Sequence, residues 1–388
     1  MTPPTRRSLL GALATATLVL LLAWAAGGQA LLGRIDPALA VPLLALPMLL
    51  LAGWQRAAPA PVRRQALLLA LAAILLTQVA LALALAGSAG WAQIALTGAA
   101  GAAAGWLADR IVQAQRFSRG VRLLVAAAML VGWFAAGHGL LAALYRPVAA
   151  SAAAPAVTML TGLPLRWADG GDIAGMIARG ASDDPALARL AAAGPVRLVD
   201  SLVDNVPPRG GTLLLAHPRA LAPQELVAID AFVRGGGRAV VLADALSGWP
   251  ARHPLGDPRN PPVTSLLTPL LDHWGITLGA AREGEGQAAA DVEGARLHLF
   301  SAGRFTALPP TCRAFADRRV AHCRIGAGEA WLVGDADLLF APLWRPLAGD
   351  TPHLRRADTM EWLAAHLWDG ADDRAAWLRP LWIRPRAG

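Results

Sequence analysis

The chain has 388 residues, of which 55% are apolar and 16% are charged, so it is long enough for two or three domains. Its formal charge is uneven: residues 1–150 carry +9, the remainder carries −1, and every basic residue is an arginine. Because the basic excess lies in the apolar half and not on a water-soluble domain, the charge pattern argues against a nucleic-acid-binding protein.

Five apolar stretches in the first part of the chain have the length that a helix needs to cross a bilayer. They are residues 8–26, 37–54, 65–86, 91–108 and 123–144. They are rich in Leu and Ala and do not alternate with polar residues, which favours helices over barrel strands. We therefore predict an α-helical membrane domain of five spans over residues 1–146, in contact with membrane lipid.

The arginines predict the orientation of these spans, because cytoplasmic loops are enriched in basic residues. Nine arginines precede the first span or lie in the second and fourth connectors: Arg6, Arg7, Arg56, Arg63, Arg64, Arg110, Arg116, Arg119 and Arg122. The other side has only Arg34, beside Asp36, and Arg146. We expect a bacterial inner-membrane protein with a cytoplasmic N-terminus and a periplasmic C-terminal domain.

Three features of the membrane domain have two interpretations each. Arg6-Arg7 resembles a twin-arginine signal, but an uncleaved first span is favoured because more spans follow. Gly98, Gly101 and Gly105 form a small-residue face, for which packing inside the bundle is favoured over a partner subunit. His138 is an ionisable residue within a span, yet no acidic residue accompanies it, so anchoring is favoured over transport.

After a linker at 147–156, strands and helices alternate through a domain predicted at 157–388. Strands are predicted at 157–160, 196–199, 212–216, 239–243, 297–300 and 330–333. Helices are predicted at 184–194, from Pro223 to the glycines at 235–237, at 266–274, and from Asp358 to a stop at Gly370. This alternation indicates a three-layer α/β domain with a mostly parallel sheet.

The stretch Gly211–Asp244 resembles the soluble domain of GldG-like ABC-transporter auxiliary proteins. It has a buried strand, a proline-containing loop, a helix of the pattern P-x-E-x-x-x-I-x-x-F-V-x-x-G-G, and a strand that ends in Asp. Residues 159–165 and 326–337 extend the resemblance over most of 155–370. It implies a class I glutamine-amidotransferase-like (flavodoxin-like) fold and, as partners, an ABC permease and an ATPase.

Catalysis of the amidotransferase type is not expected. The turn after the strand at 239–243 would carry the catalytic Cys in such enzymes, but it reads from Asp244 to Pro250 without one. Ser247 lies there without the G-x-S-x-G elbow of serine hydrolases. No P-loop is present, so the ATPase must be another subunit.

Five polar residues follow predicted strands at the edge where open α/β sheets bind ligands. They are His217, Asp244, Ser247, Asp335 and Asp337. Each is either a ligand-binding residue or a turn-capping residue, since Asp and Ser readily bond loop backbone. Spacing alone does not establish a metal site, so no metal or cofactor is predicted.

The two cysteines, Cys312 and Cys323, are too few for a structural zinc site. They either form a disulfide, which a compartment outside the cytoplasm permits, or remain as small buried residues. Together these features predict a non-catalytic membrane auxiliary subunit with a periplasmic binding domain. The alternatives are a periplasmic membrane-anchored hydrolase and a secondary transporter.

Overall fold

The computed structural model of the protein describes residues 6–114, 116–166, 183–208, 210–254, 256–257, 259–368 and 376–384. The chain forms two compact units. The membrane unit comprises Met1–Arg146, Pro346–Arg355 and Ala376–Gly388, and the α/β unit comprises Pro147–Arg345 and Arg356–Ala375. The first unit changes to the second after Arg146, where the predicted linker begins. The short segments from Pro346 and from Ala376, which were predicted as part of the α/β domain, belong to the same compact unit as the helices.

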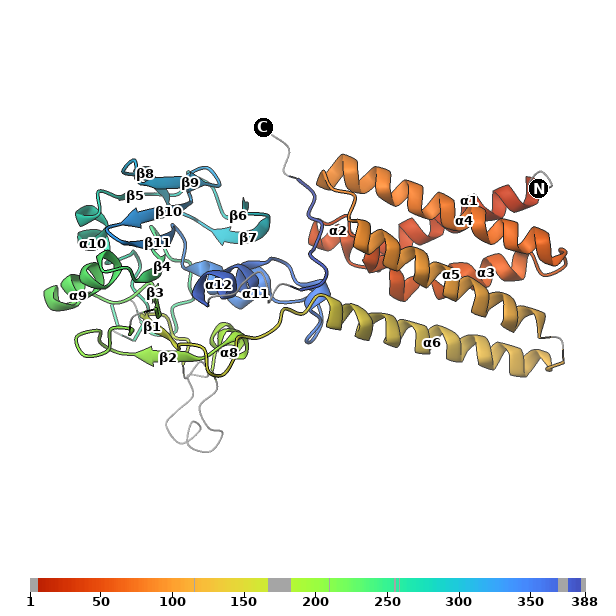
Figure 1. Cartoon of the computed structure of the whole chain (residues 1–388), viewed down its shortest axis with the longest axis horizontal. Helices are drawn as coiled ribbons and strands as arrows, with labels where there is room; N and C mark the ends of the chain where they lie inside the picture. The colour runs from red at the N-terminus through yellow and green to blue at the C-terminus, as the bar shows by residue number, and fades with distance from the viewer. Residues whose placement is uncertain are drawn as a thin grey trace, which may run out of the picture. The chain divides into compact units, whose positions relative to one another are not determined.

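Helices make up the membrane unit (Figure 1). They are α1 (Arg6–Ala25), α2 (Gln29–Leu32), η1 (Pro37–Leu43), α3 (Ala45–Trp54), α4 (Ala60–Leu81), η2 (Ala82–Ala86), α5 (Trp91–Gln113) and α6 (Arg119–Leu144). Among the described residues, three helices are long and apolar enough to cross a membrane, namely Arg6–Ala25, Ala60–Ala86 and Arg119–Leu144. They coincide with the predicted first, third and fifth spans.

The other two predicted spans are less regular. The second is broken: η1 and α3 meet at an angle of 63° and together are apolar enough for one span. Pro42 lies inside η1, where its missing N–H interrupts regular helical bonding. The fourth corresponds to α5, a continuous helix that is not among the helices apolar enough over their length to cross a membrane. Five spans therefore remain a prediction.

The glycine face of α5 packs against α4 within the membrane unit, as favoured from the sequence. Gly98 lies against Leu75, Gly101 against Leu71 and Gly105 against Leu67, and a Cβ at position 101 or 105 would overlap with the facing leucine. Glycine at these positions therefore lets the two helices approach closely.

Buried polar groups hold the segment Pro346–Arg355 to the helices of the membrane unit. Arg34 is 0% exposed, and its guanidinium donates to the carbonyls of His353 (2.7 Å) and Arg355 (2.8 Å). The Tyr145 hydroxyl donates to Asp36 at 2.6 Å. His138, the ionisable residue noted within the last span, lies with its Nδ1 2.9 Å from His353 Nε2. These long-range bonds explain why the segment belongs to this unit and not to the α/β domain.

The α/β unit contains a seven-stranded sheet of order β2-β1-β3-β4-β11-β10-β9. The strands are β1 (Val157–Thr161), β2 (Val196–Val199), β3 (Thr212–Ala216), β4 (Arg238–Leu242), β9 (Cys312–Phe315), β10 (Val320–Ile325) and β11 (Gly328–Val333). The first four and β11 pair in parallel, and β10 and β9 extend the sheet as antiparallel strands. The predicted mostly parallel sheet is thus confirmed.

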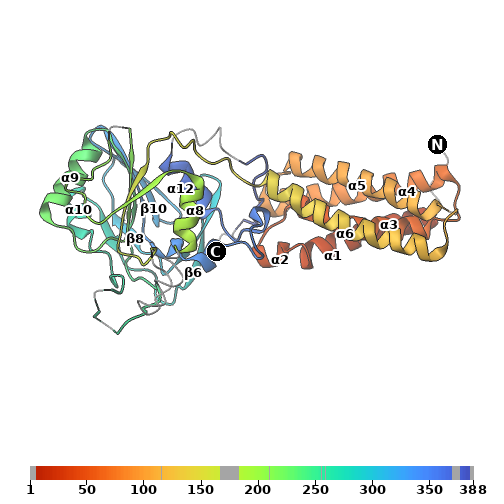
Figure 2. The ribbon, with the colours of Figure 1, turned by 90° about the horizontal axis from the view of Figure 1, so that it is seen from below.

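Helices cover both faces of this sheet, as seen in Figure 2. On one face, α8 (Pro185–Ala193) and α12 (Thr359–Leu367) bury a core with Met159 and Trp331. On the other face, α9 (Pro223–Arg234) and α10 (Thr268–His273) bury a second core with Ile229 and Leu271. The strands between them are buried on both sides, which explains their continuous apolar runs.

Strands β9 and β10 of the main sheet were not predicted, and neither were four elements outside it. They are β5 (Thr277–Gly279), paired with β8 (Arg304–Ala307), and two short helical turns, η3 (Asp337–Leu339) and α11 (Ala341–Trp344). A hairpin of β6 (Gln287–Val292) and β7 (Ala295–Phe300) was predicted only in part. The Ala-rich sequence of β6 lacks the β-branched residues that mark strands. The predicted helix stop at Gly370 lies outside the described residues.

We expect Gly105→Leu to lower the stability of the membrane unit by about 1–3 kcal/mol, since the added side chain needs space that Leu67 fills. Thermal unfolding of the full-length protein in detergent measures this. Gly132→Leu is the matched control, because a Cβ at that position of α6 meets no atom within 4 Å. Equal melting temperatures of the two variants would contradict the packing described for α4 and α5.

Candidate functional site

The candidate site lies at the carboxyl edge of the parallel sheet, where β3, β4 and β11 end. His217 directly follows β3, Asp244 follows β4 by one residue, and Asp335 and Asp337 follow β11. Because these strands run in parallel, their carboxyl ends meet at one edge, and the loops after them lie together. All five residues predicted from the sequence, including Ser247, come from these loops.

The carboxylates of Asp244, Asp335 and Asp337 converge in this edge. One oxygen of each lies within 4.8 Å of one from each of the others. Their side chains are deeply buried, with exposed fractions of 0%, 0% and 2%. Three carboxylates therefore share one small volume from which water is largely excluded.

Loop backbone supplies most of the hydrogen bonds to these carboxylates. Asp244 accepts the N–H groups of Leu246 (3.0 Å) and Ala336 (3.1 Å). Asp335 accepts the N–H of Phe300 through Oδ2 at 2.7 Å. These bonds join the cluster to the loops after β4 and β11 and to the last residue of β7, so the capping role considered from the sequence is present in the structure.

Asp337 accepts a hydrogen bond from another side chain, that of Ser247. Its Oδ1 accepts the hydroxyl of Ser247 at 2.9 Å, and its Oδ2 accepts the N–H of Gly248. Ser247 Oγ in turn accepts the N–H of Trp249 at 3.2 Å. The serine hydroxyl thus donates directly to a carboxylate, and the start of the loop after β4 is fixed by Asp337.

Burial raises the pKa of all three carboxyl groups, because it disfavours the charged form. For Asp244, burial and then the charge of Asp337 raise the pKa to about 7. For Asp335, burial followed by the charges of Asp244 and Asp337 raises the pKa well above its ordinary value, and the N–H groups of Phe300 and Asp337 offset only part of this. For Asp337, burial raises the pKa against the lowering effect of Gly248 and Ser247.

His217 lies beside the cluster in a strained backbone conformation, with φ of 48°. Its Nε2 is 2.7 Å from the carbonyl oxygen of Pro262. Since a carbonyl only accepts, Nε2 carries the proton, and Nδ1 has no hydrogen-bond partner among the described residues. Burial lowers the pKa of His217, whereas its backbone bond to Pro262 and the charge of Asp337 raise it in part.

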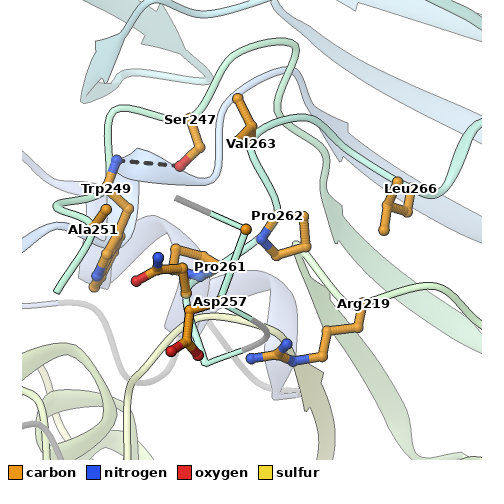
Figure 3. A pocket seen from close by; sticks show the side chains of 11 residues that line it. Arg219, Ser247, Trp249, Ala251, Asp257, Pro261, Pro262, Val263 and Leu266 are labelled. Atoms are coloured by element: carbon orange, nitrogen blue, oxygen red, sulfur yellow. Dashed lines mark hydrogen bonds between the residues drawn. The ribbon is translucent and has the colours of Figure 1, made fainter. Parts of the chain in front are cut away.

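A pocket of about 410 Å³ opens next to the cluster (Figure 3). Its wall is formed mainly by the loop between β4 and α10 and includes apolar rings and a few polar groups. The lining residues are Arg219, Ser247, Trp249, Ala251, Gly256, Asp257, Asn260, Pro261, Pro262, Val263 and Leu266. Ser247 lines the pocket and donates a hydrogen bond to Asp337, so one side chain connects the pocket to the carboxylate cluster.

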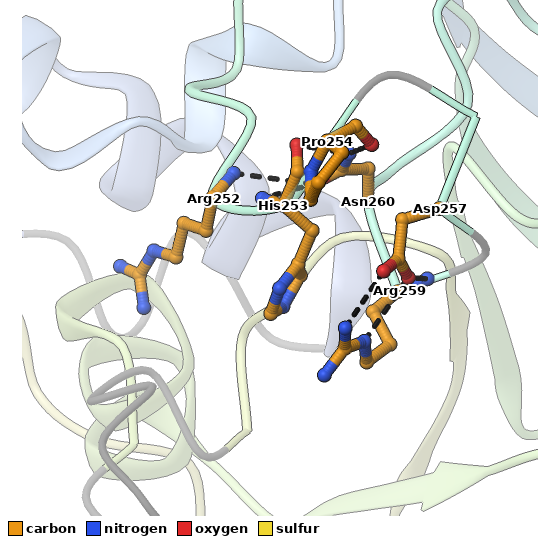
Figure 4. Close-up of polar contacts among 6 residues, drawn as sticks. All are labelled: Arg252, His253, Pro254, Asp257, Arg259 and Asn260. Carbon is orange, nitrogen blue, oxygen red and sulfur yellow. Dashed lines mark hydrogen bonds and ion pairs between the residues drawn. The ribbon is translucent and has the colours of Figure 1, made fainter.

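Asn260 organises the far part of this loop (Figure 4). Its Oδ1 accepts the N–H groups of Arg252 (3.1 Å) and His253 (3.0 Å), and its Nδ2 donates to the carbonyls of His253 (2.9 Å) and Pro254 (3.0 Å). Asp257 pairs with Arg259 at 2.7 Å. The side chain of Asn260 therefore fixes the backbone of this proline-containing loop.

The structure brings the five predicted residues together and adds the pocket residues that the sequence did not indicate. Three of these pocket residues, Arg219, Asp257 and Asn260, do not directly follow a strand. The sequence feature that could have indicated an irregular loop here is the high density of prolines between positions 250 and 262. The remaining candidates lie elsewhere: Cys312 and Cys323 are joined by a disulfide across β9 and β10.

We expect the proton on Asp244 to make a contribution to the free energy of unfolding of the full-length chain, measured with a chelator present, that falls as the pH rises from about 4 to about 7. The folded state holds a proton on Asp244 that the unfolded chain releases near pH 4. The stabilisation from this proton is therefore complete below pH 4 and lost as the pH rises through 7.

Asp244→Asn should remove this contribution, because the amide does not ionise, whereas Asp272→Asn at an exposed position should retain it. Chemical denaturation in detergent at several pH values measures the difference in free energy of unfolding between the two variants. A difference that stays constant from about pH 4 to about pH 7 would show that Asp244 is charged in the folded protein.

Comparisons with known proteins bear on the α/β unit. Residues 189–288 match the family described as "ABC-type uncharacterized transport system". No curated protein matches the sequence. The matched region runs from α8 to β6 and so includes β3, β4, Asp244 and the loop that lines the pocket.

Among solved structures, the chain is similar to parts of larger enzymes. An exo-β-1,4-mannosidase from Opitutaceae bacterium strain TAV5 is 14% identical, with 55% of this chain and 36% of that one covered and a TM-score of 0.33. A β-galactosidase from Rahnella sp. R3 is 17% identical, with 40% and 25% covered and a TM-score of 0.25. A β-galactosidase from Bacillus circulans sp. alkalophilus is 14% identical, with 40% and 24% covered and the same TM-score.

The chain spans about a quarter to a third of the length of these three enzymes, and the likeness is too low to support an inference about function. The family match is the informative comparison. Over residues 189–288 the chain is similar to this family of ABC-type transport systems, which fits the resemblance of its sequence to GldG-like auxiliary proteins.

Proposed function

We propose that this chain is a non-catalytic auxiliary subunit of an ABC-type transport or envelope assembly in a bacterial inner membrane. Five spans anchor it with the N-terminus in the cytoplasm, and the α/β domain acts as a binding domain in the periplasm. The proposal rests mainly on the match of residues 189–288 to an ABC-transport family. The matched domain follows a unit of apolar helices whose arginines lie mostly on one side of the predicted spans. Its partners are a permease and an ATPase.

Contacts inside the membrane unit support the proposed orientation. Arg7 donates to the carbonyl of Trp54, Gln113 donates to that of Arg56, and Arg63 pairs with Asp109 at 2.7 Å. These bonds place the start of α1, the turn between α3 and α4, and the end of α5 side by side (Figure 1). The arginines that indicate a cytoplasmic side therefore gather at one end of the helices.

The opposite end also contains arginines, and they are consistent with this orientation. The segments that return to the membrane unit contribute Arg355, Arg379 and Arg384. The positive-inside rule applies to short loops beside the spans, since long domains are translocated largely regardless of charge. Arg355 and Arg34 are moreover buried, and both donate to backbone carbonyls.

The geometry at Ser247 supports a non-catalytic role over the hydrolase alternative. A serine nucleophile needs a base that accepts its proton, usually a histidine held by a third group. Here the hydroxyl donates to Asp337, and His217 directs its protonated Nε2 to Pro262. The carboxylate is itself buried and hydrogen-bonded to Gly248, an arrangement suited to fixing the loop.

An alkaline phosphatase fused after Gly388 is expected to be active, and the same enzyme fused after Gln113 is expected to be inactive. The first position follows five crossings and the second follows four, so the two report opposite sides of the membrane. Green fluorescent protein at the same positions gives the reciprocal readout. An inactive phosphatase after Gly388 would overturn both the topology and the periplasmic binding role.

Full-length tagged chain, purified in mild detergent from its native membranes, is expected to retain a P-loop ATPase and a permease. The ATP hydrolysis of this preparation should be lost when the P-loop lysine of the ATPase is replaced, because the chain itself has no P-loop.

The control is an unrelated tagged inner-membrane protein treated in the same way. The proposal fails if no ATPase is retained above that control. Covalent labelling of Ser247 by a fluorophosphonate, absent in Ser247→Ala, would instead establish the hydrolase.

A further inference from the structure

The carboxylate cluster of Asp244, Asp335 and Asp337 has a feature that a capping role does not explain. The oxygen Asp335 Oδ1 is buried and accepts no hydrogen bond of good geometry from the described residues; the Asp337 N–H group is near enough to lower the pKa of Asp335 but forms no such bond with this oxygen. The other oxygen, Asp335 Oδ2, accepts a hydrogen bond from the N–H group of Phe300, and the residue is 0% exposed. Buried acceptors are nearly always satisfied, so an unpartnered carboxylate oxygen between two other carboxylates indicates a missing positive group.

The described residues do not supply that group. The hydrogen bonds that the three carboxylates accept come from backbone N–H groups and from the hydroxyl of Ser247, all of which are neutral donors. His217 is the nearby side chain that could carry charge, but its protonated nitrogen is directed to Pro262. Three buried carboxylates with neutral donors alone leave strong mutual repulsion.

We propose that Asp244, Asp335 and Asp337 bind a divalent cation of the Ca²⁺ type at the carboxyl edge of the sheet. An oxygen from each lies within 4.8 Å of the others, a spacing that lets three carboxylates contact one ion. The donors are all oxygen, which suits hard cations and not zinc. Mg²⁺ usually retains several waters in its octahedral shell, so the near-complete burial favours Ca²⁺, whose geometry is more flexible.

This site would link ion binding to the pocket. Asp337 also accepts hydrogen bonds from Ser247 and Gly248, and Asp244 accepts one from Leu246. Because these residues begin the loop that forms the pocket wall, a bound cation would fix the start of that loop. The inference does not depend on the auxiliary role, because it concerns side chains of this chain alone.

Terbium luminescence and thermal unfolding of the full-length protein in detergent test the proposal. Tb³⁺ replaces Ca²⁺ at oxygen sites and is excited by neighbouring tryptophan, here Trp249, which contacts Ser247. We expect sensitised emission that millimolar Ca²⁺ displaces, and a melting temperature that rises by about 2 °C or more from chelator to Ca²⁺. Mg²⁺ should be the weaker competitor.

Asp335→Asn should lose the sensitised emission and the Ca²⁺-dependent rise, whereas the exposed Asp272→Asn should retain both. If Asp335→Asn does not fold, Asp337→Asn gives the same comparison with a second ligand. Equal emission and equal Ca²⁺ response in the cluster variants and in Asp272→Asn would overturn the site. A wild-type melting temperature that is the same in chelator, Ca²⁺ and Mg²⁺ would do so as well.

Discussion

The burial of three carboxylates at one edge of the sheet is the constraint on which the geometry of the candidate site depends. Charge in a low-dielectric environment must be matched by donors, and here the loops after β4 and β11 and the last residue of β7 each provide a backbone N–H group. The loops are therefore positioned by the cluster as much as by their own sequence. The same strands bury their side chains on both faces, so only their ends are available for polar chemistry.

The pocket follows from this arrangement. Asp337 fixes the beginning of the loop through Ser247 and Gly248, and Asn260 fixes its far part through four backbone groups. The segment between them is rich in proline and needs few hydrogen bonds of its own. The irregular loop therefore lines a pocket of about 410 Å³ at the edge of the sheet. Binding sites in open α/β folds commonly lie at this edge.

The sequence was sufficient for the parallel strands and for the convergence of His217, Asp244, Ser247, Asp335 and Asp337, because strand order and parallel pairing place such residues at one edge. It could not indicate Phe300 as a donor to Asp335, since the hairpin of β6 and β7 has weak strand propensity. Nor could it indicate that Arg34 bonds the carbonyl of His353, 319 positions away. Such contacts depend on tertiary packing, which periodicity does not encode.

The return of two short segments to the membrane unit changes how the α/β domain is connected. The chain passes between the units after residues 146, 345, 355 and 375, so four peptide connections join them where a simple anchor has one. A domain on a single linker can rotate freely and transmits little force. With four connections, a break in the chain at any one of them still leaves the α/β domain attached through others, and the returning segment at Arg355 is itself held to the helices by the buried guanidinium of Arg34.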